Sequence, residues 1–295
     1  MARVSIVCSH GFAKIAERLM DIMSLLEEAK SLLRRHRIHP NRRLGQNFMI
    51  DPQMLRCMMD YASLDSIDVV LDVGAGLGYL TSFLARECKS VLAIELDIRL
   101  VKVLQEQLKD LPNIEIIDGD VLKVQIPQFN KVVSIPPYNI SSSLLLWLLG
   151  KTFDCAVLVF QNEFANRLVA PLGRDDYGWL TVVAYYYVMV ELLDEVPKWM
   201  FYPQPEVSSV IVRLKPKRPP PFTLKNEALF KQLVKTLFTR RNRKVRNAVL
   251  PFIKGMHLTS RKDATKLADS LLFHDRKVRE LAPEDFGELT NALTK

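Results

Sequence analysis

The amino-acid sequence predicts an α/β protein with a doubly wound, mostly parallel sheet of seven strands and a small helical domain at its C-terminal end. Two observations predict this class. Short runs rich in Val, Ile and Leu alternate with segments of helical periodicity from about residue 69, and the alternation stops near residue 216. Repeated strand–helix units joined by short loops are typical of a parallel sheet covered by helices.

The strands are expected where short apolar runs stand between turn-forming residues, because strands buried on both faces are continuously apolar. They cover residues 69–73, 91–95, 114–117, 132–135, 156–160, 181–190 and 207–214. Helices are expected from residue 78 and over residues 97–109, 142–149 and 163–169. Prolines at positions 216, 219, 220 and 221 then break the pattern and are typical of a linker.

Helical segments flank this alternating part. Residues 12–35 carry apolar side chains at helical spacing and predict an amphipathic helix, to which no chemistry is assigned. In the tail, residues 227–237, 244–252, 260–271 and 283–293 are helix-like. We therefore expect an N-terminal helical extension (1–35), an α/β domain (36–216) and a helical domain (217–295).

Composition narrows the class further. The chain has 295 residues, of which 48% are hydrophobic and 25% charged, so it is expected to be globular rather than disordered. Its four cysteines form no C-x-x-C pair and its histidines no ligand spacing, which predicts no disulfide framework, no metal and a reducing cytoplasm. The longest apolar run, 180–190, is too short for the ~20 residues that span a bilayer, so no membrane association is expected.

Positive charge is concentrated in two stretches of a chain with formal net charge +8. Residues 30–43 carry six Lys or Arg and no acid, and residues 215–246 carry eleven against one acid, Glu227. The rest of the chain is therefore net negative. Such asymmetry favours a polyanionic partner, either nucleic acid or an acidic membrane surface. On charge alone, nucleic acid is favoured over solvated helix faces that bind nothing.

A glycine-rich turn joins the first strand of the alternating part to a helix. The sequence VLDVGAGLG covers residues 70–78. Glycines such as Gly74 and Gly76 allow a tight turn and the close approach of a ligand to the backbone. The G-x-G-x-G spacing differs from the dinucleotide fingerprint G-x-G-x-x-G, and by itself it could be turn chemistry alone.

Two acidic residues favour a nucleoside at this edge of the sheet. Glu95 ends the second strand, where a carboxylate can accept both ribose hydroxyls in a Rossmann-like site. Asp120 follows the third strand, where it can accept from the exocyclic amine of an adenine. Either acid alone could be a helix N-cap. The glycine turn followed by both acids predicts a nucleoside-containing cofactor.

The fourth strand runs into the loop SIPPYNISS at residues 134–142. Proline fixes the backbone and leaves carbonyl groups free of ladder hydrogen bonds, and the ring of Tyr138 can stack on a planar substrate. A plain turn with a core tyrosine is the alternative.

These motifs resemble known families. The glycine turn is similar to the first motif of class I S-adenosylmethionine-dependent methyltransferases. Four stretches resemble, in order, motifs of the ribosomal RNA adenine N6,N6-dimethyltransferase family: NRRLGQNFMID (41–51), the loop at 134–142, FYPQPEVSS (201–209) and the basic FTRRNRKVR (238–246). The resemblance runs from about residue 36 to 252. It implies a Rossmann-like class I methyltransferase, with residues 36–216 binding S-adenosylmethionine and residues 217–295 binding RNA.

The resemblance also assigns residues. Tyr138 and Phe201 would stack on the target adenine, and the carbonyl of Pro136 would accept from its N6 amine. The cofactor would lie against Gln46, Asn47, Met49, Gly74, Gly76, Glu95, Leu96, Asp120, Val121 and the backbone of Ile135. The RNA would be bound by one basic helix carrying Arg240, Arg241, Arg243, Lys244 and Arg246, whose alternative interpretation is an exposed helix face.

One position departs from the family pattern. The family's motif asparagine, whose side chain accepts from the target amine, falls at Ile135, which cannot accept. Ser134 or a backbone carbonyl could substitute, the enzyme could be slower or add fewer methyl groups, or RNA binding could persist without chemistry. We favour retained methylation, because the cofactor residues and both aromatic residues are present.

The function implied is dimethylation of adjacent adenines in small-subunit ribosomal RNA, presented by an immature subunit to a monomeric cytoplasmic enzyme. Alternatives are another N6-adenine methyltransferase of DNA or RNA, a protein-glutamine methyltransferase, and an assembly factor without turnover. The basic tail argues against the glutamine enzyme, which has no need of it.

Overall fold

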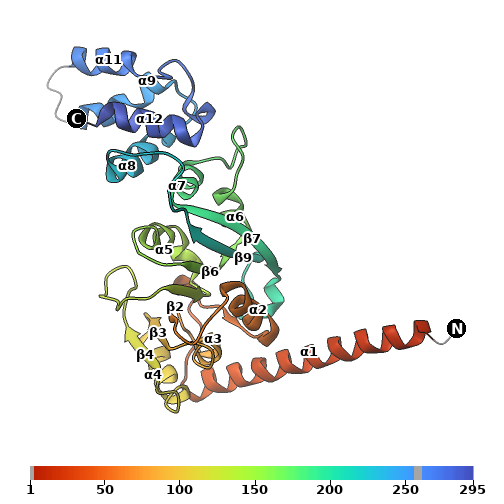
Figure 1. The fold of residues 1–295 in the computed structure, drawn as a ribbon. Coiled ribbons are helices and arrows are strands. Elements are labelled where there is room, and N and C mark those ends of the chain that lie inside the picture. The colour runs from red at the N-terminus through yellow and green to blue at the C-terminus, as the bar shows by residue number, and fades with distance from the viewer. Residues whose placement is uncertain (1–2, 256–260, 295) are drawn as a thin grey trace. The chain divides into compact units, whose positions relative to one another are not determined.

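The computed structural model describes residues 3–255 and 261–294, with side chains described in these ranges except at residues 3–17, 43 and 261. Its main feature is a seven-stranded sheet in the order β4-β3-β2-β5-β6-β9-β7 (Figure 1). The strands are β2 (Val69–Val73), β3 (Ser90–Glu95), β4 (Ile114–Asp118), β5 (Lys131–Ser134), β6 (Cys155–Gln161), β7 (Val188–Val196) and β9 (Ser209–Pro216).

Most neighbouring strands of this sheet are parallel. The pairs β2–β3, β3–β4, β2–β5 and β5–β6 are all parallel, and β6–β9 is antiparallel. β2 lies inside the sheet, between β3 and β5. The strand order therefore runs outward from β2 on both sides, toward β3 on one and toward β5 on the other. The loops that follow these parallel strands lie at the same edge of the sheet. Such a switch point is where open α/β sheets bind ligands. The predicted fold class is confirmed.

Helices follow the strands as the alternation predicts. They are α3 (Tyr79–Leu84), α4 (Ile98–Gln107), α5 (Ser141–Leu148) and α6 (Asn162–Leu168). A further helix, α2 (Pro52–Ala62), lies before β2, where no helix was expected. Buried Asp51 caps α2 by accepting from the backbone N–H groups of Gln53 and Met54. Apolar residues of α2 and α3, including Leu55 and Leu84, pack in one core with the central strands.

A second sheet has only two strands. It pairs β1 (Phe48–Met49) with β8 (Phe201–Tyr202) in antiparallel register, with Phe48 opposite Tyr202 and Met49 opposite Phe201. We call this pair the β1–β8 ribbon. It brings the predicted cofactor motif at 41–51 next to the predicted base-stacking motif at 201–209.

The N-terminal segment forms one long helix, α1 (Arg3–Arg35), which begins earlier than the expected residue 12 (Figure 1). The end of α1 is followed by a short 3-10 turn at Arg42–Leu44. The buried residues of α1 belong to a core cluster that also contains Phe48 and Ile50.

The chain divides into two compact units, and the division differs from the expected boundaries. Unit 1 comprises residues 1–162 and 191–215, and unit 2 comprises residues 163–190 and 216–295. Unit 2 therefore contains residues 163–190 in addition to the expected tail. Its helices after residue 216 are α8 (Glu227–Phe238), α9 (Val245–Ala248), α10 (Leu250–Gly255), α11 (Arg261–Ser270) and α12 (Pro283–Leu293).

The expected strand at 181–190 is wrong. Residues Trp179–Tyr187 form helix α7, and the strand β7 begins only at Val188. The helix starts where the N–H of Gly178 donates to the hydroxyl of Thr181. Six of the nine residues of α7 are buried, and the helix contacts α8 and α12. A helix that is apolar all round has no 3.6-residue pattern to distinguish it from a strand.

The expected helix at 244–252 is also interrupted. Two short helices, α9 and α10, meet near Val249, and Pro251 lies in the first turn of α10. Among the residues whose placement is described, no helix is both long and apolar enough to cross a membrane.

Candidate active site

The turn after β2 depends on three glycines. Gly74, Gly76 and Gly78 have φ values of +76°, +61° and +85°, which side chains rarely adopt. A Cβ atom on Gly74 would lie 2.7 Å from Cδ of Pro137, and one on Gly76 would lie 3.1 Å from the ring of Phe48. The turn is therefore packed directly against the loop after β5 and against the β1–β8 ribbon.

Glu95, the last residue of β3, is fixed to this turn. One carboxylate oxygen accepts from the N–H of Gly76 at 3.0 Å and the other from the N–H of Asp97 at 2.9 Å. Burial raises the pKa of Glu95, and these two backbone donors act in the opposite direction. Each oxygen keeps a lone pair for a further donor, so the carboxylate is oriented and able to accept from ribose hydroxyls.

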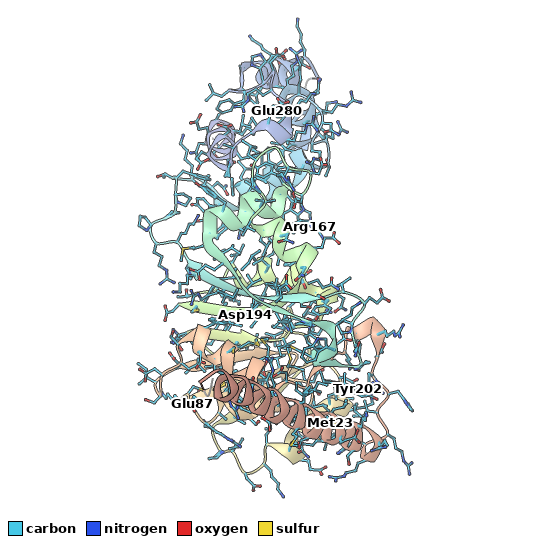
Figure 2. All side chains as sticks on the ribbon, turned by 90° about the vertical axis from the view of Figure 1, so that its right-hand side faces the viewer. Met23, Glu87, Arg167, Asp194, Tyr202 and Glu280 are labelled. Carbon is cyan, nitrogen blue, oxygen red and sulfur yellow. The ribbon has the colours of Figure 1, made fainter. Side chains whose placement is uncertain are left out.

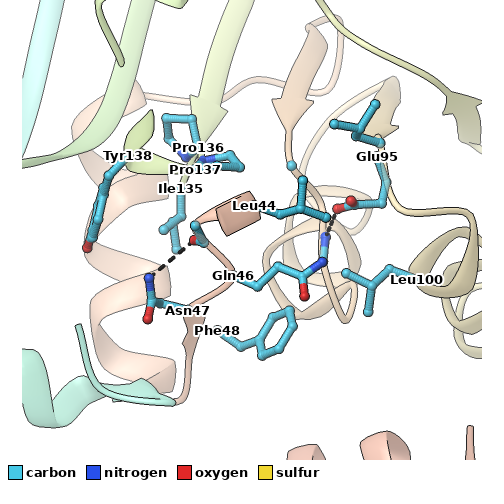
Figure 3. Close-up of a pocket in the computed structure, with 14 residues that line it drawn as sticks. Leu44, Gln46, Asn47, Phe48, Glu95, Leu100, Ile135, Pro136, Pro137 and Tyr138 are labelled. Atoms are coloured by element: carbon cyan, nitrogen blue, oxygen red, sulfur yellow. Dashed lines mark hydrogen bonds between the residues drawn. The ribbon is translucent and has the colours of Figure 1, made fainter. Parts of the chain in front are cut away.

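Two adjoining pockets lie at this edge. They share Leu44, Gly74, Glu95, Leu96 and Pro137. The first is also lined by Gly45, Gln46, Asn47, Phe48, Gly76, Leu100, Ile135, Pro136 and Tyr138. In Figure 3, Tyr138, Ile135 and Asn47 lie on one side of this pocket and Glu95 and Leu100 on the other, with Leu44 and Gln46 between them.

The second pocket is formed by the ends of β3 and β4. Asp120 and buried Val121 line it, and Leu96, whose side chain is 55% exposed, lies at its edge. Asp120 also accepts from the N–H of Leu122 at 3.0 Å and pairs with Lys123 at 3.3 Å. The carboxylate of Asp120 therefore stabilises the turn after β4 and also faces the second pocket, whose walls suit a flat purine.

The segment before β1 crosses the first pocket and is held on both sides. Gln46 donates to Asp97 at 2.9 Å, while its own oxygen accepts from the N–H of Asn41 at 2.7 Å. On the other side, a Cβ atom on Gly45 would lie 3.2 Å from Pro137 and Asn139. The Asn47 amide donates to the carbonyl of Gly45. This leaves the oxygen of the Asn47 amide able to accept.

Met49 lies deeper than its neighbours. It is 4% exposed, belongs to the main core, and lines an inner pocket together with Asn47, Gly74, Gly76 and Ile135. Thus Gln46, Asn47 and Met49 all reach the region expected for the methionine end of a cofactor, at different depths.

The loop after β5 is anchored at both ends. The hydroxyl of Ser134 accepts from the N–H of Val73 and donates to its carbonyl. Ser134 is fully buried and lines none of these pockets, so it is not placed to accept from a substrate amine. Tyr138 lies half-buried in the first pocket, and its hydroxyl bonds that of Ser209 at 2.7 Å. Burial raises the pKa of Tyr138 to about 12, so the ring is neutral at physiological pH.

Phe201 does not take the position expected of it. It is 1% exposed, lies in the main core with Met200 and Ile211, and is not among the residues that line these pockets. It pairs with Met49 in the β1–β8 ribbon, and both side chains belong to the main core. The structure thus brings Tyr138 and the expected cofactor residues to adjoining pockets, whereas Phe201 lies in the core and lines none of them.

The basic tract of unit 2 is not one helix, contrary to expectation. It follows α8, and only Arg246 lies within a helix, α9. Arg241 donates to the carbonyls of Arg174 and Asp175, and Lys244 and Arg246 pair with Asp275. Arg240 and Arg243 are exposed, so these two project most freely into solvent.

The site contains no candidate metal centre. Within residues 3–255 and 261–294, no three His, Cys, Asp or Glu side chains gather as ligands. The donor set instead fits a nucleoside: a buried carboxylate, a glycine turn closed to any side chain, and a second carboxylate at the next strand end. These features define the chain as a class I S-adenosylmethionine-dependent methyltransferase.

Comparisons with known proteins give the family. The model of the family described as "Ribosomal RNA adenine dimethylase" matches residues 37–295, and the chain belongs to this family. It is 42% identical to a "Probable ribosomal RNA small subunit methyltransferase A" of Methanosarcina acetivorans, over 84% of this chain and 91% of that protein. A protein of the same description from Thermococcus kodakarensis is 38% identical over 90% and 94%.

Solved structures agree with this membership. A dimethyladenosine transferase from Plasmodium falciparum superposes with a TM-score of 0.71 and 28% identity, over 81% of this chain and 94% of that one. The 23S rRNA methyltransferase ErmE gives a TM-score of 0.61 at 28% identity, over 84% and 100%. The resemblance inferred from the sequence motifs is confirmed.

Sequence reasoning missed several residues of the site. Leu44 lines both pockets, Asn139 and Ile140 line the second, and Asp97 holds the segment that crosses the first. Leu44 and Asn139 lie inside the motifs at 41–51 and 134–142, so their place in these motifs could have indicated that they line the site. Asp97 has the sequence position of a helix N-cap, and its link to Gln46 joins residues 51 positions apart.

Proposed function

We propose that this protein transfers methyl groups from S-adenosylmethionine to the N6 atoms of adenines in small-subunit ribosomal RNA, giving dimethyladenosine. The observation that carries the proposal is the adjacency of two pockets that share Glu95, Gly74 and Pro137. The second pocket offers acceptors suited to the nucleoside of the cofactor. The first is lined by the residues proposed for its methionine end, and also by an aromatic ring and backbone carbonyls suited to a target base. Family membership supports the same reaction.

The cofactor residues are proposed as follows. Glu95 accepts from the ribose, Asp120 from the adenine amine, and Leu96 and Val121 pack on the adenine. Gly74 and Gly76 allow the cofactor to approach the backbone, and the methionine end lies toward Gln46, Asn47, Met49 and the backbone of Ile135. The cofactor supplies an electrophilic methyl group on a sulfonium.

The target base is held by the loop after β5. An adenine N6 amine is a poor nucleophile because its lone pair is delocalised into the ring. An acceptor at the carbonyl of Pro136 would hold one N–H and aim the lone pair, while the ring of Tyr138 stacks on the base. This is catalysis by positioning and local electrostatics, and it needs no strong base. A base within folded RNA must first be extruded from its stack.

The departure at Ile135 leaves one acceptor fewer. Ser134 is not placed to replace it, because its side chain is fully buried and lines none of these pockets. We propose that backbone carbonyls of the loop suffice for methylation. Stacking by Phe201 on the other face of the base remains part of the proposal and requires that its ring become exposed when RNA binds.

The finer features of the proposal are a monomeric cytoplasmic enzyme, an immature small subunit as substrate, and RNA contacts by Arg240, Arg241, Arg243, Lys244 and Arg246. Arg240 and Arg243 are the members of this set with the best access to phosphate. Two other cations of unit 2 are less available, because Lys217 lies over the ring of Tyr185 and Lys231 over that of Tyr187.

The test is methyl transfer from tritiated S-adenosylmethionine to small subunits that lack the modification, followed by mass analysis of adenosines. Label in RNA as N6,N6-dimethyladenosine is expected. Glu95→Ala should weaken cofactor binding by roughly 1.5–3 kcal/mol, because ribose hydroxyls lose a charged acceptor. Cofactor affinity that did not change in this variant would count against the proposed site.

The same experiment separates the alternatives. An RNA-binding assembly factor is favoured by Ile135, and it would bind cofactor and subunits without labelling the RNA. A single methyl per adenine would indicate a mono-methylating N6-adenine enzyme, and label in protein would indicate a glutamine enzyme. Label that appears only when DNA replaces the subunits would indicate a DNA methyltransferase.

A further inference from the structure

Helix α1 lies outside the family match, which begins at residue 37, yet it packs on the proposed cofactor site. Its buried face and residues of the site form one apolar cluster. From α1 the cluster includes Ile22, Ala29, Leu32 and Leu33, and from the site it includes Phe48, Ile50, Leu77 and Leu100. Phe48 and Leu100 line the first pocket. A helix that forms the outer layer of a ligand pocket can influence the ligand without touching it.

An ion pair joins α1 to the same segment. The guanidinium of Arg18 donates to one carboxylate oxygen of Asp51, from Nε at 3.0 Å and from Nη2 at 2.5 Å. Asp51 is fully buried, lies two residues after β1, and caps α2. A buried carboxylate is costly without an opposite charge, so docking of α1 stabilises the backbone just beyond Met49 and Ile50.

Both strands of the β1–β8 ribbon are covered in this way. Phe48 of β1 packs between the α1 cluster and Gly76, and Tyr202 of β8 packs against the same cluster with Lys30 of α1 5.9 Å from its ring centre. Figure 2 shows Tyr202 beside α1. A two-stranded ribbon alone is marginally stable in water. The ribbon therefore depends on helix packing for a fixed position.

We infer that α1 is a positioning element for the cofactor site, and that Arg18 acts as a positioning residue through Asp51 and the β1–β8 ribbon. The inference rests on the proposed placement of S-adenosylmethionine beside residues 46–49. When α1 is docked, Asn47 and Phe48 hold the geometry that borders the cofactor. When the Arg18–Asp51 pair is broken, the ribbon samples other positions, and each binding event must reorder it. The effect falls on cofactor affinity rather than on the rate at saturation.

The test measures cofactor binding in Arg18→Ala. The probe is S-adenosylhomocysteine, titrated calorimetrically into the full-length protein. We expect its Kd to rise roughly 3- to 10-fold, in the range by which residues remote from a ligand modulate binding. The KM for S-adenosylmethionine should rise by the same factor, with kcat at saturating cofactor unchanged. Hydrogen exchange of residues 46–50 should be faster in the variant without ligand, and exchange of β2 and β3 should not change.

Matched variants separate this role from general stabilisation. Arg34→Ala removes an exposed cation from the same helix and should change neither Kd nor exchange at 46–50. Arg18→Lys keeps the charge and should restore most of the affinity. If Arg18→Ala lowered only the unfolding temperature and left Kd unchanged, α1 would be a stabilising helix and the inference would be overturned.

A positive control keeps the two proposals distinguishable. Glu95→Ala should weaken binding of the same probe whatever α1 does. Loss of affinity in Glu95→Ala with none in Arg18→Ala overturns the role of α1 alone, and no effect of either variant overturns the proposed site as well. Should Arg18→Ala prove too unstable, Ile22→Val perturbs the same packing with a smaller loss and carries the same expectation.

Discussion

The side-chain amide of Gln46 donates to the carboxylate of Asp97 at 2.9 Å and so ties the segment before β1 to the start of α4. The same carboxylate caps α4 and pairs with Arg99. Hydrogen bonds from Arg99, and next from Gln46, lower the pKa of Asp97 to about 2. Because the N–H of Asp97 donates to Glu95, one residue connects the segment over the pocket with the proposed ribose acceptor.

Gln46→Ala should therefore weaken cofactor binding although Gln46 need not bind the cofactor itself. The hydrogen bond that this variant removes ends on a charged, buried acceptor, and such bonds contribute about 1.5–3 kcal/mol. We expect a higher KM for S-adenosylmethionine with kcat nearly unchanged. Gln105→Ala, on the exposed face of α4, is the control and should leave KM at the wild-type value. An unaltered KM in Gln46→Ala would show that the segment is held without this bond.

Ile135→Asn restores the side-chain acceptor of the family motif. Ile135 lines the first pocket and packs half-buried against the main core. If the isoleucine is tolerated in place of the asparagine, the rate of methyl transfer should hold or rise, because a second acceptor can align the target amine. Ile135→Val, which adds no acceptor, is the matched control. A sharp fall in rate for the asparagine variant alone would mean that the pocket is built around an apolar side chain.

The basic tract should separate into binding and structural residues. Replacing both Arg240 and Arg243 with Ala should weaken RNA binding and reduce the slope of log K against log salt by roughly one for each phosphate that is no longer neutralised. Arg241→Ala removes hydrogen bonds to two carbonyl groups of unit 2 and should lower the free energy of unfolding by about 1–2 kcal/mol. Filter binding across a salt series and urea unfolding measure the two effects. The opposite assignment would follow if Arg241→Ala changed only the salt slope.

Asp72 should make stability depend on pH near neutrality. Burial, with a contribution from the charge of Glu95, raises its pKa to about 7, against the lowering effect of the Thr81 hydroxyl. The unfolded value is about 3.9. Because the folded pKa is the higher one, folding becomes less favourable as pH rises from about 4 to about 7, and the loss is complete above pH 7.

Asp72→Asn removes this dependence. Relative to the wild type, its free energy of unfolding should improve by about 2 kcal/mol more at pH 8 than at pH 5. Urea unfolding at the two pH values measures the difference. Asp110→Asn, at an exposed position, is the control and should show no such change. An equal effect of Asp72→Asn at both pH values would contradict a raised pKa.

The alternating part of the fold was predictable because strands such as 69–73 and 91–95 are buried on both faces, and their composition is a local property. The same reasoning failed at 181–190, because α7 is apolar almost throughout and its sequence therefore shows no helical period. The prediction that the basic tract forms one helix failed for a different reason. The charges of this tract suggested one helix face, but the main chain turns after α8 and carries them on a connecting segment.

Within the site, the motifs located Glu95, Asp120 and Tyr138 on pocket walls because each stands at a strand end, and strand ends meet at one sheet edge. Interactions between distant segments were beyond reach. The partner of Gln46, the docking of α1 on Asp51 and the burial of Phe201 depend on tertiary packing of segments far apart in sequence. No local pattern encodes them.

Leu44 stands on the wall common to both pockets, together with Glu95 and Pro137. An inhibitor that occupies both pockets at once would therefore have to pass the side chain of Leu44. In a compound that joins a purine fragment to an amino-acid fragment, the connector would pass this side chain. Selectivity among relatives would then be sought in the bulk and branching of that connector rather than in either end group.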